Sequence, residues 1–155
     1  METWRGFRRL SGFERTIALD AALAHSFTLV GLRLAGFRRW KNVLDRWSRM
    51  NSNDSTPNPA ADANSVREIA RLQAATARRL PFRTNCLEQS LVLCWLLRRS
   101  GISADLRIGA RKEADRFEAH AWVEVAGRAV DAGNEEHLHF VPLKASMNSM
   151  ETQAP

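Results

Sequence analysis

Residues 85–99, Asn-Cys-Leu-Glu-Gln-Ser-Leu-Val-Leu-Cys-Trp-Leu-Leu-Arg-Arg, decide the fold of this chain. Asn85 is a good helix N-cap, and Glu88 stands at the third helical position, as in a capping box. Cys86 is then the first helical residue. Gly101 follows two arginines, which is a common helix ending. The pattern predicts an apolar helix from this cysteine to the second arginine.

Downstream, residues 117–125 alternate between apolar and polar side chains, which is typical of a half-buried strand. We expect the core face to carry Ala119, Ala121, Val123 and Val125. The opposite face then carries Glu118, His120, Trp122 and Glu124. Residues 104–111 alternate in the same way and predict a second strand, and residues 140–143 predict an edge strand.

Ala126 and Gly127 fit a two-residue hairpin turn into a short strand over residues 128–132. In that register Val125 pairs with Arg128, and Trp122 pairs with Asp131. Asp131 would then lie one diagonal step from His120, on the same face. A register slip of one residue would remove this pairing.

Cys86, His120 and Asp131 supply a thiol, an imidazole and a carboxylate in that order along the chain. A cysteine nucleophile needs these groups: the thiolate attacks, the imidazole moves the proton, and the carboxylate orients the imidazole. The positive end of a helix favours the thiolate, and its free N–H groups can form an oxyanion hole. The alternatives are a buried structural cysteine, which Cys94 resembles, and an exposed histidine. Glu118 is a second candidate partner for His120.

Two further residues are candidates for supporting roles. Asn85 is able to donate to an oxyanion, although helix capping is its simpler role, and Trp122 either shields the site from water or packs. His137 and His139 form an H-x-H spacing that matches no zinc motif. The sequence contains no glycine-rich phosphate loop. We therefore expect neither a metal nor a cofactor.

Residues 11–47 are predicted to be helical, with Ser11 as N-cap and Glu14 three residues later. Apolar residues lie nearly all round this segment, so it is buried on several sides or is completed by another protein. Gly31 and Gly36 allow a bend. Residues 17–37 are the only membrane candidate, but they contain Asp20, His25 and Arg33. These interruptions favour a buried or partner-binding helix over a membrane span.

Composition restricts the remaining possibilities. The 155 residues carry a net charge of +6, and much of the basic excess lies in residues 5–49. Nucleic acid, an acidic peptide or a membrane surface would attract such a face, or it is simply solvated. No nucleic-acid module is recognisable. Cys86 and Cys94 would lie about 12 Å apart along one helix, too far for a disulfide. Free thiols and the lack of a signal-peptide pattern favour the cytoplasm.

The predicted organisation has four parts. Residues 1–50 form a helical segment that packs on the core, and residues 51–64 form a linker rich in small and polar residues. Residues 65–143 form the core, in which a helix resumes at Ser65 and stops at Leu80-Pro81. Residues 144–155 form a polar, disordered tail.

Several stretches of the chain resemble the transglutaminase-like leader peptidases of lasso-peptide biosynthesis. The resemblance rests on residues 80–91 around Asn85-Cys86-Leu87, on residues 96–102, on Leu106-Arg107-Ile108-Gly109, and on residues 117–124 around Ala119-His120-Ala121-Trp122. It is strong over residues 65–143 and looser over the N-terminal helices. The family's cysteine block often continues with arginine, where this chain has Gln89.

The resemblance implies an α+β, papain-like, transglutaminase-type core, with a cysteine-bearing helix against an antiparallel sheet. It implies a cysteine protease that removes the leader from a ribosomally made precursor. Cys86 would be the nucleophile, His120 the base and Asp131, less distinctively placed, the orienting group. The chain resembles the split form, which relies on a separate leader-recognition protein and a macrolactam cyclase; ATP use is assigned to that partner enzyme. The N-terminal helices would dock the recognition protein or the leader. An acyl transferase with the same triad and a non-catalytic binding scaffold are the alternatives.

Overall fold

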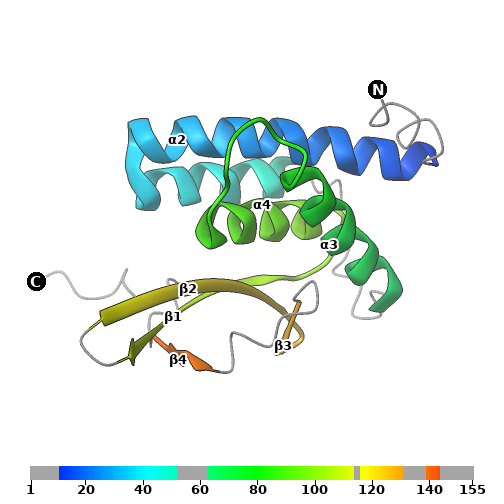
Figure 1. The fold of residues 1–155 in the computed structure, drawn as a ribbon. Coiled ribbons are helices and arrows are strands. Elements are labelled where there is room, and N and C mark those ends of the chain that lie inside the picture. The colour runs from blue at the N-terminus through cyan, green and yellow to red at the C-terminus, as the bar shows by residue number, and fades with distance from the viewer. Residues whose placement is uncertain (1–10, 52–62, 114–115, 131–138, 144–155) are drawn as a thin grey trace, which may run out of the picture.

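The computed structural model describes residues 11–51, 63–113, 116–130 and 139–143. Its helices lie over one face of an antiparallel sheet, which makes the fold α+β (Figure 1). The helices are α2 (Gly12–Asn51), α3 (Ala63–Ala77) and α4 (Cys86–Arg99). The strands are β1 (Asp105–Glu113), β2 (Arg116–Val125), β3 (Arg128–Ala129) and β4 (Val141–Pro142), in the order β3-β2-β1-β4.

Helix α2 is a helical hairpin and not one straight rod. The helical conformation is interrupted at Gly36, which has φ 72° and ψ 168°, and Figure 1 shows the chain doubling back there. The two arms pack closely: a Cβ on Gly31 would lie only 2.2 Å from the Trp40 ring, so the absence of a side chain at this position is what allows the contact. The two predicted glycines therefore have different roles. Gly36 reverses the chain, and Gly31 lets the second arm approach the first.

The first arm of α2 has two different apolar faces. Ile17, Ala21 and Ala24 are buried in the core. The opposite face carries an exposed row at helical spacing, called here the α2 apolar stripe: Leu19, Leu23, Phe27, Val30 and Leu34. Of the two predicted alternatives, burial on several sides is wrong for this face, because no described element covers the stripe.

Among the described residues, one helix, Gly12–Trp47, is long and apolar enough to cross a membrane by length and composition alone. The reversal at Gly36 divides that length between two arms. Asp20 on the first arm binds Arg99 of α4 at 3.5 Å, and His25 is buried. These contacts tie the arm to the rest of the fold.

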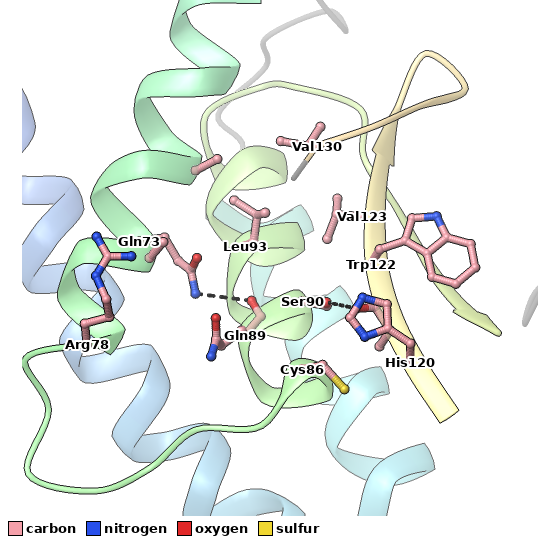
Figure 2. A pocket seen from close by; sticks show the side chains of 13 residues that line it. Gln73, Arg78, Cys86, Gln89, Ser90, Leu93, His120, Trp122, Val123 and Val130 are labelled. Carbon is pink, nitrogen blue, oxygen red and sulfur yellow. Dashed lines mark hydrogen bonds between the residues drawn. The ribbon is translucent and has the colours of Figure 1, made fainter. Parts of the chain in front are cut away.

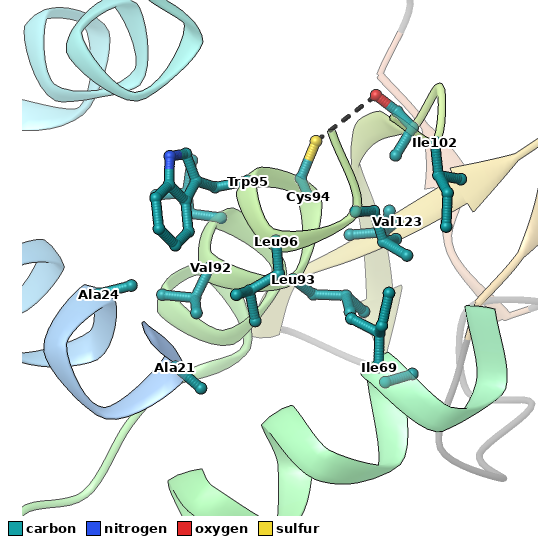
Figure 3. Packing of buried hydrophobic residues seen from close by; sticks show 14 of the residues in the cluster. Ala21, Ala24, Ile69, Val92, Leu93, Cys94, Trp95, Leu96, Ile102 and Val123 are labelled. Atoms are coloured by element: carbon teal, nitrogen blue, oxygen red, sulfur yellow. Dashed lines mark hydrogen bonds between the residues drawn. The ribbon is translucent and has the colours of Figure 1, made fainter. Parts of the chain in front are cut away.

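Helix α4 lies at the centre of the core. Residues 91–97 are buried without interruption, and they pack against α2, α3 and β2 (Figure 3). At its C-terminal end Arg98 binds Asp45 of α2 at 2.6 Å and donates to the Ala104 carbonyl at 2.8 Å. Helix α4 thus contacts the other helices and the sheet, and these contacts hold both of its ends in place.

The predicted hairpin register is confirmed for the described pairs. Val125 pairs with Arg128, and Ala126 and Gly127 both have positive φ, as a type I′ turn requires. The Val130 N–H donates to the Val123 carbonyl at 2.8 Å, which continues the same register by one more residue pair. Asp131 is outside the described residues, so its predicted pairing with Trp122 remains a prediction.

The predicted division of β2 into a core face and a solvent face is partly wrong. Trp122 was assigned to the outer face but is only 3% exposed, and its ring packs over Gly109 of β1, where a side chain would collide with it. Ala119 was assigned to the core but is exposed, because the beginning of β2 extends past α4 (Figure 1). Alternation gives the face of a residue but not how far the opposing layer reaches.

The predicted boundaries are close to the observed ones. Helix α4 begins and ends as predicted, whereas α3 begins at Ala63, two residues early, and ends at Ala77. Strands β1 and β2 meet in a ladder from Asp105–Glu124 to Glu113–Arg116, and β4 confirms the expected edge strand. Residues 144–155, predicted as a tail, lie outside the described residues.

We predict that Gly36→Ala lowers the free energy of unfolding by about 1–3 kcal/mol, because its backbone conformation is essentially restricted to glycine. No atom lies within 4 Å of a Cβ built there, so the cost is backbone strain alone. Thermal or urea unfolding measures it. Gly12→Ala is the matched control, since its Cβ also meets nothing and its φ is ordinary. Equal stability of the two variants would contradict a reversal that depends on glycine.

Candidate active site

The beginning of α4 is fixed by a complete capping box. The Asn85 Oδ1 accepts from the Glu88 N–H at 2.9 Å, and a Glu88 carboxylate oxygen accepts from the Asn85 N–H at 3.0 Å. Gln89 N–H donates to the Asn85 carbonyl at 3.0 Å. Within the described part of the chain, the N–H groups of Cys86 and Leu87 have no protein acceptor. Two amide donors therefore remain beside the thiol.

A buried hydrogen bond joins the helix of Cys86 to the strand of His120. The Ser90 hydroxyl donates to the Ala121 carbonyl at 2.8 Å. Ser90 lies one helical turn after Cys86, and Ala121 is the residue next to His120. The bond thus holds the thiol-bearing turn of α4 against the imidazole-bearing part of β2. Sequence reasoning missed Ser90, whose signal was its position four residues after the cysteine.

Cys86 and His120 line one cavity of about 260 Å³, which we call the Cys86 cavity. Figure 2 shows the Cys86 sulfur and the His120 ring at the same end of this cavity. The remaining lining comes from α3, α4, β2 and Val130. The lining residues that bear polar groups are Gln73, Arg78, Gln89 and Ser90. The structure therefore brings two of the three predicted catalytic residues to one concave site.

The His120 ring stacks on two aromatic side chains, Trp122 and Phe140. Its centroid lies 6.3 Å from that of Trp122 and 5.1 Å from that of Phe140, with interplanar angles of 17° and 29°. Gly109 pairs with His120 across the β1–β2 ladder, and a Cβ there would lie 2.9 Å from both Trp122 and Phe140. This glycine leaves room for the rings that hold the imidazole. Phe140 was predicted only as part of an edge strand, and nothing in the sequence placed it beside His120.

The remaining predicted site residues have the following positions. Asp131 lies outside the described residues. Glu118, the alternative partner of His120, binds Arg111 at 2.6 Å instead, because Arg111 is directly opposite it on β1. The Trp122 Nε1 donates to Glu124 at 3.1 Å, so this residue packs as well as lining the cavity. Asn85 uses its side-chain oxygen for the helix cap, as described above.

The cavity is supported from behind by a buried polar pair. The Gln73 amide nitrogen lies 3.1 Å from the His25 Nε2 and 3.4 Å from the Gln89 carbonyl oxygen. Gln89 is itself held by Thr84, at 3.1 Å from the amide nitrogen to the hydroxyl. Burial lowers the pKa of His25 from 6.5 to about 4, so the ring is neutral near pH 7. A neutral imidazole is suited to this contact with an uncharged amide.

The two cysteines of α4 are both free, as predicted, but they lie in different surroundings. Cys86 is partly exposed in the cavity. Cys94 is buried two turns later and donates to the Ala104 carbonyl at 3.5 Å (Figure 3). Burial raises the pKa of the Cys94 thiol to about 11. Cys94 is therefore the structural cysteine that the sequence predicted.

We predict that Ser90→Ala destabilises the chain by about 1–3 kcal/mol, because the Ala121 carbonyl loses its buried hydroxyl donor. Denaturant unfolding measures this effect. Ser26→Ala is the matched control, since the Ser26 hydroxyl makes a similar bond to the Ala22 carbonyl on an exposed face. A loss no larger for Ser90→Ala than for the control would contradict the role given to this bond.

We also predict that acidification destabilises the fold through His25. The folded-state pKa is below the unfolded value, so the unfolded chain binds the proton first and stability is lost as the pH falls from 6.5 towards 4. Between pH 7 and pH 5 the loss is on the order of 2 kcal/mol. Urea unfolding at the two pH values, compared with His25→Gln, measures it. If the variant shows the same pH dependence, His25 is not the group responsible.

Comparison with known proteins agrees with this geometry. A search of curated proteins and a search of solved structures return no significant match. A family model described as the transglutaminase-like superfamily matches residues 28–145, which is more than half of the chain. The match includes the second arm of α2, the helix of Cys86 and the strand of His120. The chain therefore belongs to the transglutaminase-like superfamily, which indicates chemistry of the cysteine-peptidase or acyltransferase type.

Proposed function

We propose that this chain is a cysteine peptidase that removes the leader from a ribosomally synthesised lasso-peptide precursor. One observation carries the proposal: Cys86 and His120 line the same cavity, at a helix N-terminus with two available amide donors. The resemblance of the cysteine block, the β1 motif and the β2 motif to lasso-peptide leader peptidases supplies the substrate class. The third catalytic group is proposed to be Asp131, which follows the described end of the hairpin by one residue.

In the first half of the reaction, the Cys86 thiolate attacks the carbonyl carbon of the amide between leader and core. The carbonyl oxygen becomes an oxyanion, and the N–H groups of Cys86 and Leu87 donate to it. The C–N bond then breaks. The imidazolium of His120 gives its proton to the leaving nitrogen, so the core peptide departs with a free amine and the leader is held as a thioester.

In the second half, His120 takes a proton from a water molecule, whose oxygen attacks the thioester carbonyl. Collapse of the tetrahedral intermediate breaks the C–S bond and regenerates the thiolate. The leader leaves as a carboxylic acid, and the imidazole is again protonated. The two aromatic rings that stack on His120 keep it oriented through both steps. The proposed reaction steps use no metal or cofactor.

The proposed partners are a separate leader-recognition protein and the macrolactam cyclase that uses the freed core amine. The α2 apolar stripe supports an interaction with a protein partner, because exposed contiguous apolar patches of this kind mark binding surfaces. The stripe lies on the face of α2 turned away from the core, so a bound partner would leave the Cys86 cavity open.

The first test is the rate of alkylation of each cysteine by iodoacetamide near pH 7, resolved by mass spectrometry. We expect Cys86 to react quickly, and His120→Ala to slow it by about tenfold or more, because the imidazole no longer stabilises the thiolate. Cys94 is an internal control, since it is buried and stays protonated. Equal rates for Cys86 in the two proteins would favour a non-catalytic scaffold.

The second test is cleavage of a precursor peptide encoded by a neighbouring gene, with the recognition protein present. Cys86→Ala should abolish cleavage, whereas Cys94→Ala should retain it at any temperature where that variant is folded. Cleavage by Cys86→Ala would refute the nucleophile assignment. Product masses separate the alternatives: a leader acid indicates hydrolysis, and a leader amide of an added amine indicates acyl transfer.

A further inference from the structure

A second, larger groove lies next to the Cys86 cavity, between α3 and the β2–β3 hairpin. Its volume is about 670 Å³, and we call it the α3 groove. It shares four lining residues with the Cys86 cavity: Ala70, Ala74, Arg78 and Val130. The two hollows are therefore adjacent, so a peptide lying in the groove would have one part beside the cavity of the thiol.

The rim of the α3 groove is strongly basic. Four arginines line it, Arg67, Arg71, Arg78 and Arg128, and no carboxylate is among the lining residues. Arg71 binds Glu14 of α2 at 3.2 Å. For the other three, the described part of the chain provides no carboxylate within ion-pair distance. Three guanidinium groups around one groove attract an anionic occupant.

The floor of the groove is made of small and apolar side chains. Alanines and valines from both walls line it: Ala63, Val66, Ala70 and Ala74 of α3, and Val125, Ala126, Ala129 and Val130 of the hairpin. Such a floor admits a polypeptide backbone close to the surface. The lining contains no aromatic side chain, whereas surfaces that bind single-stranded nucleic acid use aromatic rings to stack bases. The composition thus favours a peptide over a nucleic acid.

The β3 edge offers backbone groups to an extended peptide. Val130 donates to the Val123 carbonyl, and Val125 pairs with Arg128 next to the turn. These are the hydrogen-bonded pairs of the ladder, so Ala129 between them belongs to a non-hydrogen-bonded pair. Its N–H and C=O point away from β2, and Ala129 lines the groove. A peptide lying there can therefore pair with the β3 edge as an added strand.

We propose that the α3 groove binds an acidic, extended stretch of the peptide substrate and guides it to Cys86. The inference rests on the proposed peptidase function, and it adds a charge requirement: acidic side chains close to the cleaved bond. The carboxylates would meet Arg67, Arg78 and Arg128, while the backbone lies on the alanine floor. The selectivity would be electrostatic and therefore weakened by salt.

The test uses the full chain carrying Cys86→Ala, so that binding is measured without turnover. The probe is a fluorescein-labelled peptide of alternating Glu and Ala, compared by anisotropy with its Gln and Ala counterpart. We expect the Glu peptide to bind at least about tenfold more tightly at low salt. Arg67→Gln with Arg128→Gln should weaken its binding by about tenfold. Arg78 is left in place because it also lines the Cys86 cavity.

The matched control is Arg38→Gln with Arg39→Gln, which removes the same charge from exposed α2 positions outside both hollows. It should leave binding within about twofold, as expected for distant surface charges. Equal binding of the Glu and Gln peptides, or equal weakening by the two double variants, would overturn the proposal. Displacement of the peptide by oligothymidylate at lower concentration than by unlabelled peptide would also overturn it, in favour of nucleic acid.

The outcomes are separable from those of the proposed function. Selective binding of the Glu peptide with an unreactive Cys86 would support the groove and count against the peptidase. Cysteine-dependent precursor cleavage without preference for the Glu peptide would support the peptidase and count against the groove. A bound Glu peptide should also slow alkylation of Cys86 in the unmutated chain, because the proposal places the bound peptide beside the Cys86 cavity.

Discussion

The bond between the Ser90 hydroxyl and the Ala121 carbonyl is the contact on which the site depends. A helix N-terminus and a strand can pack in many relative positions if only apolar side chains meet. A buried hydrogen bond permits few of them, because leaving the carbonyl without a donor costs about 1–3 kcal/mol. The donor lies one turn from Cys86, and the acceptor is bonded to His120. The hydrogen bond therefore fixes the position of Cys86 relative to His120, while the rest of α4 is held by apolar packing.

The imidazole is oriented by shape as well as by hydrogen bonds. Trp122 and Phe140 both stack on His120, and Gly109 gives them room. Phe140 comes from beyond the hairpin and is covered in turn by the Arg111 guanidinium at 4.9 Å. The glycine in the β1 motif and the tryptophan in the β2 motif thus belong to one arrangement. This explains why two short motifs far from the cysteine accompany it in the sequence.

Local signals predicted much of this molecule. The capping box placed the beginning of α4 correctly, because its two hydrogen bonds join residues only three positions apart in the chain. The Ala126–Gly127 turn predicted the hairpin register, because a two-residue turn leaves no freedom in the pairing. Contacts between distant segments were not predictable. The Trp122 ring packs over Gly109 of the neighbouring strand, and Glu118 pairs with the arginine opposite it. The arginines of the α3 groove come from α3, from the residue that follows it and from the hairpin, so they form a cluster only after folding.

The two cysteines show how position on one helix separates chemistry from structure. Cys86 stands at the first turn, where backbone N–H groups point outward and the cavity admits a substrate. Cys94 stands two turns later, within the buried run of residues 91–97, and desolvation keeps its thiol protonated. Helix α4 therefore carries a partly exposed cysteine at its beginning and a buried one in its middle. The apolar middle anchors the helix against α2, α3 and the sheet, and this anchoring allows the exposed first turn to hold its thiol in place without being buried itself.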